Sequence, residues 1–196
     1  MSPTGESTSE PISTAVPVGV EMDTSHPSGG SGPYAVISTS AGTIVAELFP
    51  ASAPKTVANF VSLANAGFFK GLIWHRIVKG FVIQTGDPQT KNGGGNRRLW
   101  GTGGSNQTVP LEISSLRNDT GTLGMARSQN PNSGSSQFYI NLADNAFLNG
   151  GYTVFGKVTN GLDVAMVLGS LPVDSSQQPL APAQATVTSI TIRDTP

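Results

Sequence analysis

From residue 34 onwards, the apolar positions fall mainly into short runs rich in alternating, β-branched and aromatic residues, which predict β-strands. The first two runs flank a short turn that contains Gly42, and this arrangement predicts a β-hairpin. Loops rich in glycine and asparagine separate several of the later runs. The predicted strands are residues 34–39, 43–49, 72–78, 81–84, 124–127, 137–142, 154–158 and 185–193.

Two segments have the period of a helix instead. In residues 53–66 the apolar side chains form a single helical stripe, which consists of Val57, Phe60, Val61 and Ala64. Pro54 suits the first turn of this helix and Gly67 suits its end. A second, shorter helix is predicted over residues 161–168. About eight strands and two helices without regular βα alternation predict a mainly β fold, an antiparallel sheet closed on itself with helices capping its ends.

The first 33 residues have a different composition from the rest. Ser, Thr, Pro and Gly occupy 21 of these positions, and the segment carries four acidic and no basic residues. So little apolar surface cannot offset the entropy cost of ordering, which predicts a disordered tail at 1–33 and one folded domain at 34–196. The segment lacks the pattern of a signal peptide. We therefore expect a cytoplasmic protein, with a periplasmic or secreted one as the alternative if the N-terminus is processed or truncated.

Composition and charge exclude several classes of protein. The 196 residues contain 11 Lys and Arg against 12 Asp and Glu, a formal net charge of -1. This balance provides no basic field for nucleic acid. No apolar run approaches the length of a membrane span. Without cysteine, the chain can have neither a catalytic thiol nor a Cys-based zinc site. We expect no cofactor and no metal, and nothing in the sequence requires more than a monomer.

The densest group of candidate functional residues lies in residues 74–88. Strand alternation predicts that Trp74 and Arg76 share a face, and a break at Lys79-Gly80 changes the phase of the following strand. An arginine, a phenylalanine and a glutamine can then reach one concave face. Composition alone also allows Arg76 to be an ordinary surface charge. His75 has no partner for general-base work, and we interpret it as structural.

Residues 74–88 closely resemble the signature stretch of the cyclophilin family of peptidyl-prolyl isomerases. Three further segments, residues 121–127, 130–141 and 147–158, resemble the family as well, and all of them occur in family order. The resemblance covers essentially residues 34–193, although residues 89–100 fit poorly. It implies a closed eight-stranded antiparallel barrel with two helices and a shallow groove on the outside.

The resemblance also implies roles for individual residues. Arg76 matches the catalytic arginine, and Gln84 matches the glutamine that holds both substrate and arginine. The implied substrate-binding residues are Phe81, Met125, Ala126, Arg127, Gln137, Tyr139, Phe147, Leu148 and Tyr152. Phe147 and Tyr152 replace Trp and His of many eukaryotic members, as in the bacterial type. Because Phe147 lacks an indole N–H donor, we expect cyclosporin to bind only weakly.

The expected function is therefore cis–trans isomerisation of X–Pro peptide bonds, which assists protein folding. The expected partners are proline-containing peptides and unfolded or folded client proteins. Two alternatives use different chemistry. A non-catalytic module would bind proline peptides in the same groove without needing Arg76, and a lipocalin-like carrier would hold a small ligand inside the barrel.

Overall fold

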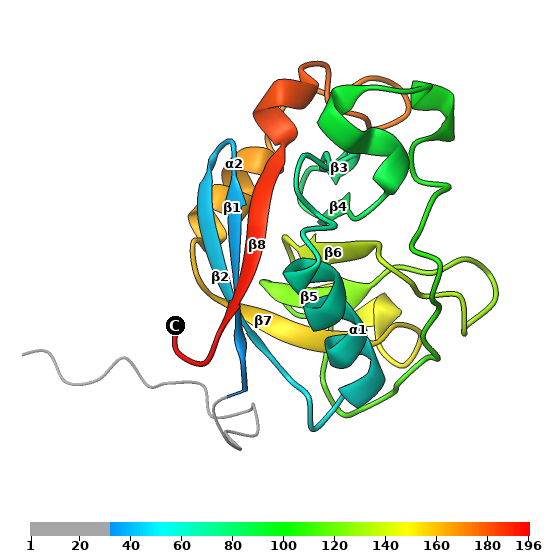
Figure 1. Cartoon of the computed structure of the whole chain (residues 1–196), viewed down its shortest axis with the longest axis vertical. Coiled ribbons are helices and arrows are strands. Elements are labelled where there is room, and N and C mark those ends of the chain that lie inside the picture. Colours follow the sequence, from blue (N-terminus) through cyan, green and yellow to red (C-terminus); the bar gives the residue numbers. More distant parts are fainter. Residues whose placement is uncertain (1–31) are drawn as a thin grey trace, which may run out of the picture.

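One antiparallel sheet of eight strands forms the body of the molecule (Figure 1). The computed structural model describes residues 32–196, so the predicted tail lies outside the described residues except for Gly32 and Pro33. The spatial order of the strands is β3-β4-β6-β5-β7-β2-β1-β8. Their bounds are β1 Tyr34–Thr39, β2 Gly42–Leu48, β3 Arg76–Val78, β4 Val82–Thr85, β5 Thr122–Met125, β6 Phe138–Asn141, β7 Val154–Asn160 and β8 Val187–Arg193.

The two ends of this curled sheet are joined by the residues that precede β3. The N–H groups of Gly71 and Trp74 donate to the carbonyls of Val187 and Ala185, each at 2.8 Å. Val187 N–H donates in return to the carbonyl of Leu72 at 2.8 Å. These bonds bring the two edges of the sheet together. The mainly β, eight-stranded antiparallel fold with two helices is confirmed.

The two predicted helices are present as α1 (Pro54–Asn65) and α2 (Leu162–Leu168). The predicted stripe of α1 faces inward, with Val57, Phe60 and Ala64 buried. In the loops of the described part of the chain lie four short 3-10 helices: η1 (Pro88–Gly93), η2 (Arg97–Leu99), η3 (Ala146–Leu148) and η4 (Pro182–Ala185). None of the helices in residues 32–196 is long and apolar enough to cross a membrane.

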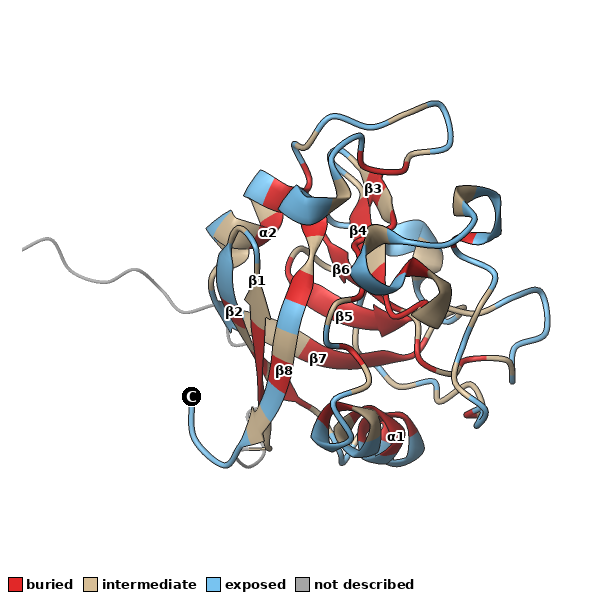
Figure 2. Cartoon of the chain, turned by 45° about the horizontal axis from the view of Figure 1, so that its top comes forward, coloured by how far each residue is buried: buried red, intermediate tan, exposed pale blue. Residues whose placement is uncertain are grey.

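Buried residues lie along the strands and on α1 (red in Figure 2), and the largest fully buried side chains are aromatic. Phe60 of α1 lies 5.3 Å from the rings of Phe69, Phe138 and Phe155, centroid to centroid. Trp74 packs edge-on against Phe138 at 5.8 Å. Such a packed interior leaves the outer surface as the place for a binding groove, which argues against a carrier that holds its ligand inside the barrel.

The predicted strand 72–78 is only partly regular. Trp74 is fully buried in the core, whereas Arg76 is half-buried on the outer side. The prediction that Trp74 and Arg76 share a face is therefore wrong. Residues 71–74 pair with residues 185–187 rather than with β4, so the two-residue alternation is interrupted before β3 begins.

Candidate active site

Three candidate residues form a row across neighbouring strands on the outer face of the sheet. In the strand register Arg76 is opposite Gln84, and Gln84 is opposite Tyr139. Tyr139 is in turn opposite Gly124. Directly opposed residues have side chains on the same face, about 5 Å apart at Cβ. The antiparallel register thus places side chains from β3, β4 and β6 next to one another.

A hollow of about 160 Å³ lies over this row. Its apolar and aromatic lining is contributed by Phe81, Val82, Tyr139, Leu148 and Tyr152, together with Ala126. Its polar lining consists of Arg76, Gln84 and Arg127. The hollow therefore combines an apolar socket with guanidinium groups at its edge.

The guanidinium of Arg76 is fixed through one of its three nitrogens. Its Nε donates a hydrogen bond of 2.9 Å to Oε1 of Gln177. Its central carbon lies 5.6 Å from the centroid of the Phe81 ring. Within the described part of the chain, the two terminal NH₂ groups of Arg76 have no hydrogen-bond partner. They are available as donors at the edge of the socket.

Phe81 lines the socket, and Phe147 stacks on it from beside the socket without lining either hollow. Their rings are stacked, with centroids 5.6 Å apart and planes 23° from parallel. Phe147 is 75% exposed. A ring that is so accessible and yet supported from behind offers an apolar surface to a ligand without first rearranging.

A chain of hydrogen bonds orients Gln84. Its Nε2 donates to Oε1 of Gln137 at 2.8 Å, and Nε2 of Gln137 donates to the carbonyls of Gly101 and Gly103. Oδ2 of the buried Asp87 accepts from the N–H groups of these two glycines at 2.6 and 3.1 Å. The glycine-rich loop is thus a turn fixed by a buried carboxylate.

A second hollow, of about 290 Å³, continues from the first. Both hollows are lined by Gln84, Ala126 and Arg127. The second is otherwise lined by small and polar residues: Gly101, Thr102, Gly103, Gly104, Ser128, Ser133, Ser135 and Gln137. Because they share these three residues, the two hollows form one groove, with its apolar part beside Arg76.

Two tyrosines, Tyr139 and Tyr152, form one wall of the socket near Arg127. The hydroxyl of Tyr139 donates to Oδ1 of Asn118 at 2.7 Å. Burial raises the pKa of the Tyr139 phenol well above its usual range, so this side chain stays neutral. The guanidinium of Arg127 lies 4.6 Å above the ring centroid of Tyr152, and its Nε donates to the carbonyl of Gly151 at 2.9 Å. These contacts give the wall a fixed shape.

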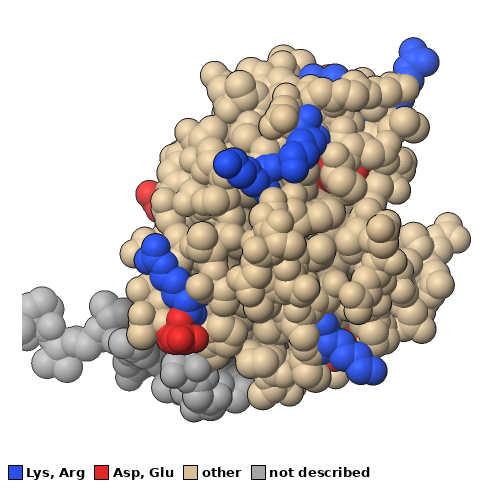
Figure 3. Space-filling view, viewed as in Figure 1, with Lys and Arg blue, Asp and Glu red and all other residues tan. Residues whose placement is uncertain are grey.

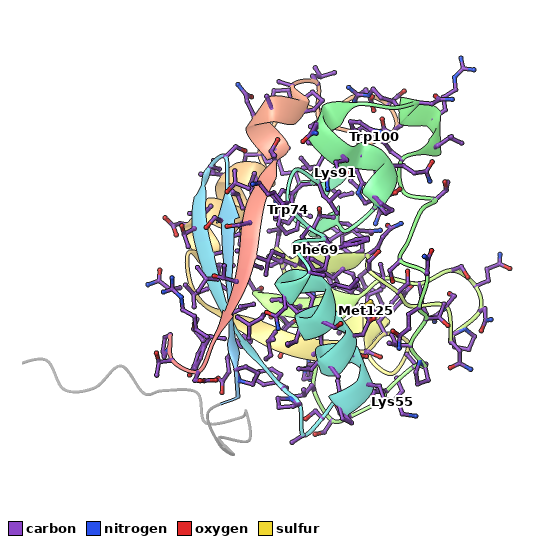
Figure 4. The ribbon with its side chains drawn as sticks, viewed as in Figure 1. Lys55, Phe69, Trp74, Lys91, Trp100 and Met125 are labelled. Atoms are coloured by element: carbon purple, nitrogen blue, oxygen red, sulfur yellow. The ribbon has the colours of Figure 1, made fainter. Side chains whose placement is uncertain are left out.

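Met125 was predicted to line the groove, but it lines neither hollow. It is opposite Phe138 in the ladder, and Phe138 is fully buried in the core. Because side chains alternate along a strand, Met125 points to the inner face, while Gly124 and Tyr139 belong to the outer one. Met125 is accordingly part of the hydrophobic core (Figure 4).

Sequence reasoning missed two residues of the site. Val82 lines the socket, and Gln177 contacts Arg76 from 101 positions further along the chain. The alternation along residues 81–84 contained a signal for Val82, because it shares a face with Gln84. No local pattern could have identified Gln177.

The remaining candidate chemistry lies behind the groove. His75 is buried, and in the described residues neither of its ring nitrogens has a hydrogen-bond partner. Burial lowers the pKa of His75, with a smaller opposing effect from Asp87. In residues 32–196 no group of three or more His, Asp or Glu side chains could bind a metal ion.

Lys and Arg are spread over separate places on the face seen in Figure 3.

Comparison with known proteins places this geometry in context. Residues 34–192 match the model of a family described as cyclophilin type peptidyl-prolyl cis-trans isomerase/CLD. A probable peptidyl-prolyl cis-trans isomerase of Brucella suis is 48% identical over 125 residues, which span 62% of this chain and 64% of that protein. Peptidyl-prolyl cis-trans isomerase ppi1 of Schizosaccharomyces pombe is 42% identical over 148 residues, 74% of this chain and 91% of that protein.

Solved structures are similar as well. The crystal structure of a cyclophilin type peptidyl-prolyl cis-trans isomerase of Cryptosporidium parvum superposes with a TM-score of 0.73 at 33% identity. The alignment covers 83% of this chain and 98% of that one. A second crystal structure of the same protein, in the presence of the dipeptide Ala-Pro, also gives a TM-score of 0.73.

Proposed function

Because this chain belongs to the family of cyclophilin type peptidyl-prolyl cis-trans isomerases, we propose that it catalyses rotation about X–Pro peptide bonds. One observation carries the proposal. The terminal NH₂ groups of Arg76 lie at the edge of an apolar socket that Phe81, Leu148 and Tyr139 help to form. A proline ring in this socket would place its imide bond within reach of the guanidinium.

The chemistry of the reaction explains why such an arrangement suffices. Rotation about X–Pro passes through a state in which the amide has lost its resonance, with a barrier of about 18–20 kcal/mol. In that state the prolyl nitrogen is pyramidal and regains a lone pair. A rigid, permanently charged guanidinium that donates to this nitrogen binds the twisted amide better than the planar one. No covalent bond is broken, so Arg76 acts by electrostatic stabilisation.

The hydrogen bond from Arg76 cannot supply the whole effect. A ten-thousandfold acceleration requires about 5.5 kcal/mol, and one charged hydrogen bond contributes roughly 1.5–3 kcal/mol. We attribute the rest of the lowering of the barrier to the fixed position of the substrate. The socket holds the proline ring, and the backbone near Ala126 and Arg127 pairs with the extended peptide on one side of it. The other side of the imide bond is then free to turn.

The proposed substrates are proline-containing peptides and unfolded or folded client proteins. The dipeptide Ala-Pro used with the Cryptosporidium parvum relative supports this substrate class. The groove offers one apolar socket and otherwise small polar groups. Such a groove selects weakly among the residues that flank the proline.

A cis–trans exchange assay on a tetrapeptide with a central Ala-Pro bond tests the proposal. We expect the full chain to accelerate exchange in proportion to its concentration, at concentrations far below that of the peptide. Binding of the peptide with no acceleration would instead identify a non-catalytic proline-binding module. If the peptide shows no binding and no acceleration, the groove is rejected as a peptide site.

A further inference from the structure

The catalytic arginine is held from a loop that lies far away in the sequence. Gln177 contacts the β3 strand through both its side chain and its backbone. Its Oε1 accepts from Nε of Arg76 at 2.9 Å, and its carbonyl oxygen accepts from the N–H of Ile77 at 2.9 Å. The bond to Nε leaves both NH₂ groups of Arg76 free to face the groove.

Gln177 has an unusual backbone conformation. Its φ is 64°, in the left-handed region, where residues other than glycine are uncommon. Such a conformation persists only where the surrounding structure enforces it, and it is enriched at functional sites. Here the N–H of Gln177 donates to the carbonyl of Asp174 at 3.0 Å. The resulting tight turn points the Gln177 side chain at Arg76.

The turn is the tip of a loop, residues 172–180, whose two ends are joined. Leu180 N–H donates to the carbonyl of Pro172 at 2.9 Å, and Asp174 N–H donates to the carbonyl of Gln178 at 2.9 Å. Oδ1 of Asp174 also accepts from the N–H of Ser176 at 2.9 Å. The loop is therefore internally hydrogen-bonded.

Arg97 fixes this loop to the rest of the molecule. Its NH₂ donates to Oδ2 of Asp174 at 3.1 Å and to the carbonyl of Pro179 at 2.9 Å. Its Nε donates to Oε1 of Gln178 at 3.1 Å. Its guanidinium lies 4.9 Å from the ring of Trp100, which is labelled near the top of Figure 4. Arg97 and Trp100 both lie within residues 89–100, the segment that fits the family resemblance poorly.

We propose that Gln177 is a positioning residue for Arg76, and that Arg97 keeps the 172–180 loop in the conformation that presents it. The inference deepens the proposed function and rests on it. An unrestrained arginine side chain loses rotamer freedom whenever it adopts one geometry. A hydrogen bond to Nε makes that selection before the substrate binds, and preorganisation of this kind lowers the barrier of the chemical step.

Two substitutions remove the contact and spare the backbone. Asparagine and glycine both tolerate the left-handed region, and neither can reach Nε of Arg76. For Gln177→Asn and Gln177→Gly we expect kcat to fall about tenfold, as for the loss of one charge-assisted hydrogen bond, with KM within about twofold. The melting temperature should stay at or above that of the unsubstituted chain for Gln177→Gly. The matched control is Ser176→Ala, whose side chain makes no hydrogen bond in the described residues, and its kcat should be unchanged.

A double-mutant cycle distinguishes positioning from a general structural effect. If Gln177 acts through Arg76, then Gln177→Asn should cause no further loss in an Arg76→Ala background. Arg97→Gln should lower kcat in the unsubstituted chain and have no effect on kcat once Gln177 is Asn. The proposal is overturned if the folded Gln177 variants keep full kcat, or if their loss persists without Arg76.

A measurement that needs no activity separates this proposal from the proposed function. In the full chain, ¹⁵N NMR of the Arg76 Nε–Hε group should give an ordered signal with slow hydrogen exchange. In Gln177→Asn that signal should become mobile and exchange faster. An identical signal in both proteins overturns the positioning role even if the chain is an active isomerase. The expected change in an inactive chain would support the contact and reject only the proposed function.

Discussion

The ring of Tyr139 lies over the backbone of Gly124, in the space that a side chain at position 124 would occupy. The two residues are opposite each other in the β5–β6 ladder. Tyr139 is nevertheless a wall of the socket, and it is buried there. The absence of a side chain at position 124 is thus what allows an aromatic ring to lie flat on the sheet at this point.

Gly124→Ala is therefore expected to damage both stability and activity. The added methyl group overlaps the Tyr139 ring, and such overpacking costs about 1–3 kcal/mol. Displacement of the ring should also lower kcat/KM, because the ring is part of the socket. Urea denaturation and the exchange assay measure the two effects. In a Tyr139→Leu background, Gly124→Ala should cost little further stability; an equal cost in that background would mean that the overlap is not the cause.

Arg76→Ala is expected to keep the fold and to lower kcat/KM at least tenfold, in line with one charged hydrogen bond of about 1.5–3 kcal/mol. Arg76 is only half-buried, so its removal leaves no large cavity. Circular dichroism and melting temperature would establish that the variant is folded. Arg76→Lys keeps the charge without the rigid fork and should remain well below the unsubstituted chain. Full activity in a folded Arg76→Ala protein would remove Arg76 from its catalytic role.

Phe147→Trp is expected to tighten cyclosporin binding about tenfold. Phe147 is exposed beside the socket, where an indole N–H would be a new hydrogen-bond donor of about 1.4 kcal/mol, the free energy of a tenfold change. A tryptophan ring can also keep the stacking on Phe81, so kcat/KM should change less than threefold. Isothermal titration measures the affinity. Equal affinities of Phe147→Trp and the unsubstituted chain would refute the role of the indole donor.

Much of the fold could be predicted from local pattern. The stripe Val57, Phe60 and Ala64 has a helical period because one face of α1 packs inward, and those three residues are buried. The Gly42 turn likewise joins two paired strands, as the β-branched runs on either side indicated. Both signals come from residues within a few positions of one another, where sequence spacing determines geometry.

Contacts between distant segments could not be predicted in the same way. The first turn of α1 has no side-chain cap from Ala53. Its N–H groups instead donate to the carboxylate of Glu112, with Thr56 N–H at 2.8 Å. Gln177 approaches Arg76 from an equally remote position. Met125 was assigned to the groove from the family resemblance, whereas its position opposite the buried Phe138 places it in the hydrophobic core.

The protein is expected to lose stability as the pH falls below about 6.5, because of His75. Burial lowers the pKa of this side chain in the folded state, whereas an unfolded chain gives histidine a pKa of about 6.5. Between the two values the unfolded state binds more protons, so protonation favours unfolding. Stability is therefore complete above the unfolded value and declines as the pH falls, by up to about 1.4 kcal/mol per pH unit.

Urea denaturation between pH 5 and 7 measures this slope, and His75→Gln is the comparison. The substitution removes the titrating group, so its contribution to the slope should disappear whatever the absolute stability of the variant. The carboxyl of Asp144 does not interfere, because hydrogen bonds from Thr120 hold its pKa below the usual range of aspartate and hence below this window.

Activity of the unsubstituted chain should stay nearly flat from about pH 6 to 9, since guanidinium does not titrate there and the buried Tyr139 phenol stays neutral. A single-proton step in kcat/KM below pH 6.5 that vanishes in His75→Gln would instead make the histidine a participant in the reaction.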